Sequence, residues 1–170
     1  PISLVCGVKM RLTRAAEYAI RCVLYLARQG QGVLASRQEI ARQADIPAHF
    51  LAKIAQDLAR AGLIEIRQGA KGGFVLSKDP AAISLLEVVE TMIGEIQLND
   101  CIGRASGCKS SYHCTVHRVW LAARNQLRGT LRQVSFEQLS ADACLPAFPE
   151  VLLETEQDHE TAPSTPAKWQ

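Results

Sequence analysis

The sequence predicts a mainly α-helical protein with a small β-wing, and three observations lead to this fold class. Apolar residues recur at helical spacing through much of residues 13–61. Two short runs of apolar and β-branched residues, 63–66 and 74–76, flank a glycine-rich loop. A second long helical pattern, residues 115–134, follows a cysteine-rich stretch that has no periodicity. We therefore expect a winged helix-turn-helix domain followed by a long helix.

The first three helices are predicted from capping signals as well as from periodicity. Thr13 is expected to cap the first helix. Ser36 and Glu39, three residues apart, form the pattern of a capping box at the start of a short second helix. Pro47 suits the first position of a third helix that stops at Gly62. A short helix, a tight turn and an amphipathic helix together predict a helix-turn-helix.

The second half of the chain predicts two more helices separated by a loop, and then a short final helix over residues 135–142. Ser84 followed by Glu87 is again the pattern of a capping box, and the helix it opens should end at Gly94. The long helix over 115–134 has little of its own chain to pack against. A second copy of the chain would cover it, so we expect a two-fold homodimer.

The chain divides into four predicted regions that differ in charge. They are an N-terminal extension (1–9), a winged helix-turn-helix domain (10–80), a cysteine-bearing loop with dimerisation helices (81–141) and an acidic, disordered tail (142–170). Residues 150–170 carry a charge of −4, which leaves +6 on the remainder. A basic body suits contact with nucleic acid. With no apolar run of the ~20 residues that span a membrane and no signal-peptide pattern, a cytoplasmic location without membrane association is expected.

Exposed polar residues of the helix-turn-helix and the wing are the candidate contacts to double-stranded DNA. The N-terminal part of a recognition helix reads base edges in the major groove, whereas preceding residues and the wing hold phosphates or enter the minor groove. These candidates are Ser36, Arg37, His49, Lys53, Arg67 and Lys71. No nucleophile–base pair, phosphate loop or pair of catalytic carboxylates is recognisable, so an enzyme is not predicted.

A metal centre is predicted in the loop that carries Cys101, Cys108, Cys114 and His117. Six, five and two residues separate these four in order. Clustered cysteines in a cytoplasmic chain favour metal over disulfide chemistry, and the C-x-x-C pairs usual in structural zinc sites are missing here. Three thiolates and one imidazole make a complete ligand set for a 2Fe–2S cluster.

Several alternatives to this centre remain open at the level of sequence. Three thiolates could hold a 4Fe–4S cluster with a weak or external fourth ligand. A zinc-stabilised protein-interaction module, or a redox enzyme or electron carrier, would also use such residues. Cys22 lies on the apolar face of the first helix and is expected in the core. The roles of Cys6 and Cys144 are not predicted.

Four stretches of the chain resemble a family of bacterial winged helix-turn-helix iron–sulfur transcription regulators, the IscR/NsrR-like family. The resemblance covers roughly residues 10–140. It rests on "MRLTRAAEYAIR", "IARQADIPAHFLAKIAQDLARAGLI", "RQGAKGGFVLSK" and the cysteine triplet. It implies a dimeric repressor or activator whose cluster state changes DNA binding.

The resemblance also implies roles for single residues. Cys101, Cys108 and Cys114 match the family's three cluster cysteines, and His117 matches the histidine that completes the 2Fe–2S site in the IscR branch. In some relatives an acidic residue in the first helix of the partner subunit is the fourth ligand, and Glu17 stands at that position. That variant implies a 4Fe–4S, nitric-oxide-sensing repressor. The first cysteine spacing, with six intervening residues, is one longer than in the IscR-type site.

Overall fold

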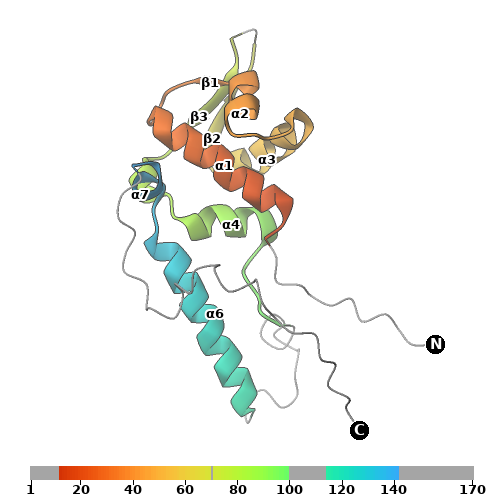
Figure 1. The fold of residues 1–170 in the computed structure, drawn as a ribbon, viewed down its shortest axis with the longest axis vertical. Helices are drawn as coiled ribbons and strands as arrows, with labels where there is room; N and C mark the ends of the chain where they lie inside the picture. The colour runs from red at the N-terminus through yellow and green to blue at the C-terminus, as the bar shows by residue number, and fades with distance from the viewer. Residues whose placement is uncertain (1–11, 70, 100–113, 142–170) are drawn as a thin grey trace, which may run out of the picture.

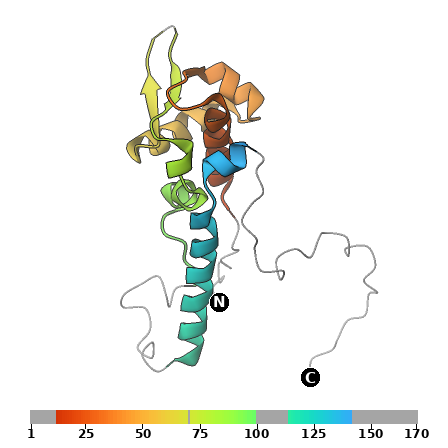
Figure 2. The ribbon, with the colours of Figure 1, turned by 90° about the vertical axis from the view of Figure 1, so that its left-hand side faces the viewer.

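The structure, a computed structural model, describes residues 12–69, 71–99 and 114–141. A winged domain lies at one end, and one long helix projects away from it (Figures 1 and 2). The predicted fold class, mainly α with a small wing, is confirmed. The predicted extension over 1–9 and the predicted tail from 142 lie outside the described residues.

Helices form most of the described chain. They are α1 (Arg14–Gln29), α2 (Arg37–Gln43), α3 (Ala48–Arg60), the 3₁₀ turn η1 (Pro80–Ala82), α4 (Leu85–Ile93), α6 (Thr115–Gln133) and α7 (Phe136–Ser140). The strands are β1 (Ala35–Ser36), β2 (Ile64–Arg67) and β3 (Gly73–Leu76). They form one antiparallel sheet in the order β1-β3-β2, in which Phe74 pairs with both Ala35 and Ile66. The predicted hairpin is therefore present, and β1 is a third strand that the sequence pattern did not predict.

Both predicted capping boxes form only half of their hydrogen bonds. Ser36 Oγ accepts a hydrogen bond from the Glu39 amide at 3.2 Å, as expected. The Glu39 carboxylate does not return to Ser36 but accepts a hydrogen bond of 2.7 Å from the Tyr25 hydroxyl, which links α2 to α1. This hydrogen bond favours the protonated phenol and raises the pKa of Tyr25. At the second box, Glu87 pairs with Lys78 at 2.7 Å.

A complete capping box forms at the start of α7, the short final helix that the sequence predicts. Ser135 Oγ accepts from the Gln138 amide, and Gln138 Oε1 accepts from the Ser135 amide at 3.0 Å. Pro47 lies at the N-cap of α3, one position earlier than expected. The predicted caps Thr13 and Ser84 lie where the sequence placed them, each accepting from the amide three residues later.

The hydrophobic core joins the winged domain to both elements that flank α6. Ile83, Val88 and Phe136 are fully buried in the same cluster as the core of α1, α3 and the sheet. The Phe136 amide donates to the Ile83 carbonyl at 3.0 Å, and the Leu85 amide to the Val134 carbonyl at 2.9 Å. The C-terminal end of α6 is therefore held firmly on the winged domain, while the rest of the helix extends outward (Figure 2). The division at residue 80 stays a prediction.

Two wing glycines are required by the protein's own backbone. A Cβ at Gly72 would lie 2.4 Å from the Arg67 carbonyl oxygen, and a Cβ at Gly73 would lie 2.1 Å from that of Ala35. Both distances are far shorter than van der Waals contact. The glycine pattern therefore has a structural cause in addition to any approach to a ligand.

Replacing Gly73 with alanine is expected to destabilise the fold, because β1 must move away from β3 to admit the methyl group. We expect a loss of about 1–3 kcal/mol, the usual cost of overpacking, measured by chemical denaturation. Gly129→Ala is the matched control. It lies inside α6 with open space around its Cβ position, and alanine there should stabilise the helix by roughly 0.5–1 kcal/mol. Equal stability of Gly73→Ala and the native chain would contradict the expected clash.

Candidate nucleic-acid interface and cysteine segment

Helix α3 presents one polar face to solvent and one apolar face to the core. Leu51, Ile54 and Leu58 are buried. His49 and Lys53, the predicted base readers, are both exposed. The His49 ring lies 4.5 Å from that of Phe50, measured between centroids, so packing partly orients it. The exposed polar face thus has the form of a recognition helix.

A further polar residue extends this face. Gln56 is exposed one turn beyond Lys53, at the helical spacing that places it beside His49 and Lys53. Its spacing from those two residues could have identified it from the sequence. An amide side chain in this place can donate to and accept from a base edge.

A cleft between α2 and the wing brings together three of the predicted phosphate contacts. Ser36, Arg37 and Gln38 line it from β1 and α2, and Arg67 and Gln68 line it from the wing. The two glutamines are additional candidates that the sequence pattern does not indicate. Arg67 also pairs with Glu65 at 3.3 Å, and both side chains are about half exposed, so solvent weakens the pair and the guanidinium can exchange partners.

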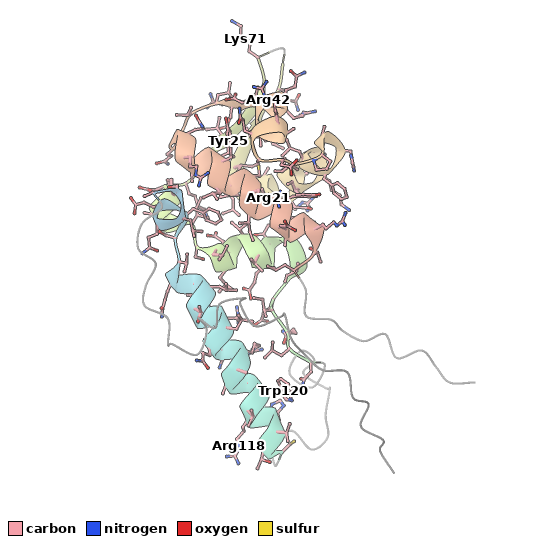
Figure 3. The ribbon with its side chains drawn as sticks, viewed as in Figure 1. Arg21, Tyr25, Arg42, Lys71, Arg118 and Trp120 are labelled. Carbon is pink, nitrogen blue, oxygen red and sulfur yellow. The ribbon has the colours of Figure 1, made fainter. Side chains whose placement is uncertain are left out.

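The sixth predicted contact lies apart from this cleft. Lys71 is exposed at the tip of the wing (Figure 3). A long basic side chain at a wing tip can reach along a duplex while the recognition helix occupies the neighbouring groove. The six predicted residues thus form three groups, on α3, in the cleft and at the wing tip.

The cysteine segment ends at the start of α6. Cys114 is the N-cap residue of this helix, and its side chain makes no capping hydrogen bond. His117 follows within the first turn. Its Nδ1 is shielded from solvent and has no hydrogen-bond partner among the described residues. Cys101 and Cys108 lie outside the described residues. The structure therefore places two of the four predicted ligands, Cys114 and His117, in one helical turn.

Buried polar atoms without hydrogen bonds occur along α6 and in the residues that follow α4. In the described part of the chain they belong to Gln97, His117, Arg124 and Arg128, which all lie after α4 or on α6. Buried polar groups normally have partners, so each exception needs an explanation such as a missing ion, water or partner. The described residues contain no cluster of three or more potential metal ligands.

Cys22 differs from the clustered cysteines in its surroundings. It is fully buried in the winged core, as expected from its place on the apolar face of α1. Burial disfavours the thiolate and raises the pKa of Cys22 to about 12. A thiol that stays protonated is a poor metal ligand, so Cys22 is a packing residue.

Glu17, the alternative ligand, lies exposed on α1. Its carboxylate pairs with Arg21 at 2.6 Å, and Arg21 also lies 3.6 Å from Asp45 Oδ2. Asp45 has a positive φ of 50° in the turn between α2 and α3. Helix α6 carries Cys114 away from α1 (Figures 1 and 2). Glu17 is therefore not beside Cys114 within one chain, and only the Glu17 of a second subunit could join it.

The arrangement of helix-turn-helix, three-stranded wing and projecting helix defines a winged helix-turn-helix transcription regulator. Residues 12–142 match the family model Rrf2, described as an iron-dependent transcriptional regulator. The chain belongs to the Rrf2 family. No helix in the described ranges is long and apolar enough to cross a membrane.

Relatives and solved structures agree with this assignment. The transcriptional regulator IscR of Photorhabdus laumondii is 28% identical over 130 residues, which are 76% of this chain and 79% of the relative. The regulator NsrR of Shouchella clausii is 36% identical over 95 residues, 56% of this chain and 64% of its own. These relatives are regulators, which supports the expectation that the chain is not an enzyme.

Two solved structures share the fold. The global cysteine regulator CymR of B. subtilis superposes with a TM-score of 0.65 at 20% identity, over 80% of this chain and all of CymR. IscR of T. potens gives a TM-score of 0.62 at 17% identity, over 78% of this chain and 88% of its own. The winged fold with its long helix is therefore shared by regulators with different named roles.

Proposed function

We propose that this chain is a cytoplasmic, homodimeric regulator whose binding to double-stranded DNA is controlled by an iron–sulfur cluster. The proposed ligands of a 2Fe–2S cluster are Cys101, Cys108, Cys114 and His117. The observation that carries this proposal is the start of α6, where Cys114 and His117 share one turn. The Cys114 side chain caps nothing, and a buried nitrogen of His117 has no partner among the described residues.

The donor set fits such a group. Thiolates and imidazole are the ligands that iron–sulfur clusters use in proteins, and the N-terminus of α6 favours negative charge. A bound cluster would make the protein respond to a change in redox state or to loss of the cluster. The chain's part is to hold the loop between α4 and α6 in one arrangement when the ligands are engaged.

The dimer is proposed from the surface of α6. None of its 19 residues is buried. Val116 is 57% exposed, Val119 65% and Trp120 40%, and helical spacing places them on one face. Trp120 lies near the far end of the helix (Figure 3). A second copy of α6 presents the same apolar face, so two such helices would cover each other.

The attachment of α6 to the winged domain can couple the cysteine segment to DNA binding. Its C-terminal end continues into α7, whose Phe136 is buried in the winged core. A change in how two α6 helices pair would therefore move each winged domain with its helix. Half-site spacing in helix-turn-helix dimers is fixed by the distance between recognition helices, so such a movement would change DNA affinity.

A second candidate is a 4Fe–4S, nitric-oxide-sensing repressor in which Glu17 of the partner subunit is the fourth ligand. Its support is the chain of ion pairs from Glu17 through Arg21 to Asp45. Ligation would take the Glu17 carboxylate away from Arg21, and Arg21 contacts the turn that sets α3. This candidate thus offers a direct link between cluster state and the recognition helix.

Anaerobic purification with absorption spectra and assays for iron, sulfide and zinc tests the proposed function. We expect iron and acid-labile sulfide in equal amounts, as in a 2Fe–2S or 4Fe–4S cluster. Zinc without sulfide would indicate a zinc-stabilised interaction module instead. A cluster in a chain that is not retained on DNA would indicate an electron carrier.

The double variant Arg67→Gln, Lys71→Gln is expected to bind DNA more weakly at every sequence. Each lost phosphate contact should reduce the slope of log affinity against log salt by about 0.9, so the pair should reduce it by about 1.8. The measurement is a salt titration on a duplex that the wild-type chain selects from random sequences. Arg132→Gln, an exposed change at the end of α6, is the control. An unchanged slope in the wing variant would contradict phosphate contact by the wing.

A further inference from the structure

A network of charged side chains joins three segments around the entrance to the cysteine loop. Arg128 on α6 donates one hydrogen bond to Glu95 at 2.6 Å and another to Glu90 on α4 at 3.0 Å. Its Nε lies 2.8 Å from the other Glu90 oxygen but is not aligned for a hydrogen bond. Arg124, one turn earlier, lies 3.9 Å from Glu95.

Glu90 also holds the backbone of the same segment. Its Oε1 accepts a hydrogen bond from the Ile96 amide at 3.0 Å. Ile96 is buried with Leu86 and Val89 of α4, against which Leu127 and Leu131 of α6 pack. The residues just after α4 are therefore fixed on two sides, by apolar packing and by ion pairs.

The charged members are largely shielded from solvent. The side chain of Glu90 is 20% exposed, that of Arg128 22% and that of Arg124 17%, whereas Glu95 is 49% exposed. Shielded pairs with two hydrogen bonds are stronger and more specific in geometry than exposed ones. The side chains of the pairs Glu17–Arg21, Glu65–Arg67 and Lys78–Glu87 are more exposed than those of Glu90 and Arg128.

The network fixes the two ends of the cysteine loop relative to each other. Glu95 lies six residues before Cys101, while Cys114 and His117 begin the helix that carries Arg128. The segment after α4 runs beside α6 (Figure 1). Arg128 thus fixes the position of the segment after α4 relative to α6. Helix α6 carries the last two predicted ligands at its start.

We propose that Arg128, acting with Glu90 and Glu95, is a positioning residue for the cysteine loop and so for the iron–sulfur cluster. This inference rests on the proposed function, in which the loop holds the cluster. A purely structural role, in which the network only attaches α6 to α4, makes a different prediction. In that case Glu95, which belongs to neither helix, would not matter.

Glu95→Gln and Arg128→Met are the test variants, and Arg132→Met is the matched control on the same helix. We measure the rate of cluster loss to an iron chelator, thermal unfolding, and hydrogen exchange of the peptide that contains residues 94–99 in the cluster-free chain. Both test variants should lose the cluster about tenfold faster, the order of effect of residues that orient metal ligands. Both should also exchange faster at residues 94–99, with Arg132→Met like the native chain.

Normal cluster retention in Glu95→Gln would overturn the inference, even if Arg128→Met unfolds at a lower temperature. The conservative change Arg128→Lys should give an intermediate rate, because an ammonium keeps the charge but cannot hold two carboxylates in a fixed fork. If the native chain contains no cluster, the proposed function fails separately. Unchanged exchange at residues 94–99 in Glu95→Gln would then overturn the positioning role as well.

Discussion

Replacing Val119 and Trp120 with glutamate is expected to turn the dimer into a monomer and to abolish measurable binding to an operator. Both side chains lie on the unpaired apolar face of α6, 65% and 40% exposed. In a dimer each would be buried against the partner helix. A carboxylate in that position is desolvated without a cation to pair with, at a cost of several kcal/mol for each ion.

The loss of DNA binding follows from the loss of the second subunit. A dimer engages two half-sites, and the second contact forms at the high effective concentration set by the first. Losing this bivalency reduces affinity by about 10²–10⁴-fold. The fold of the monomer should persist, because no residue of α6 belongs to the buried core.

Light scattering measures whether the variant is a monomer, and retention on a selected duplex measures whether it still binds DNA. The control is Asn125→Glu, which also adds a carboxylate to α6. Asn125 is exposed and, at 100° per residue, lies on the opposite side of the helix from Val119 and Trp120. That variant should remain a DNA-binding dimer. A dimer in the Val119, Trp120 variant would show that another surface joins the subunits.

The sequence predicted the elements well where a local pattern decides them. Caps such as Thr13 and Ser84 act within three residues, and the two main strands of the wing are apolar runs that flank a glycine-rich loop. Strand β1 was missed because its two residues, Ala35 and Ser36, are too few to show a pattern. It exists only because Gly73 lets the backbone of β3 approach it.

The partners of individual side chains could not be predicted in the same way. Glu39 and Glu87 fit capping boxes by spacing, yet each bonds to a side chain brought near by the tertiary fold. Arg128 meets residues 33 and 38 positions away, and nothing in the local sequence indicates them. The candidate ligands are a different case, because metal chemistry restricts residue types and spacing and so lets the sequence predict them. They stay a prediction, since Cys101 and Cys108 lie outside the described residues.

The fourth ligand is where the two candidate functions give opposite results. His117→Ala is expected to change the absorption and paramagnetic spectra of the cluster, whereas Glu17→Gln should leave both as in the native chain. The reason is that His117 presents a shielded ring nitrogen without a partner among the described residues, one turn from Cys114. Glu17, in contrast, already has Arg21 as its partner.

The unfolding stability of the Glu17→Gln and His117→Ala variants distinguishes loss of a ligand from loss of the fold. The pair of Glu17 with Arg21 is 52% and 40% exposed, and such pairs contribute roughly 0–1 kcal/mol, so Glu17→Gln should unfold almost as the native chain does. His117 Nδ1 has no hydrogen-bond partner among the described residues, so the alanine variant should also fold. Cys114→Ala should lose the cluster altogether and serves as the reference for a broken site. If Glu17→Gln alters the spectra while His117→Ala does not, the ligand comes from α1 of the partner subunit. Arg21, freed toward Asp45, would then connect the cluster directly to the turn before the recognition helix.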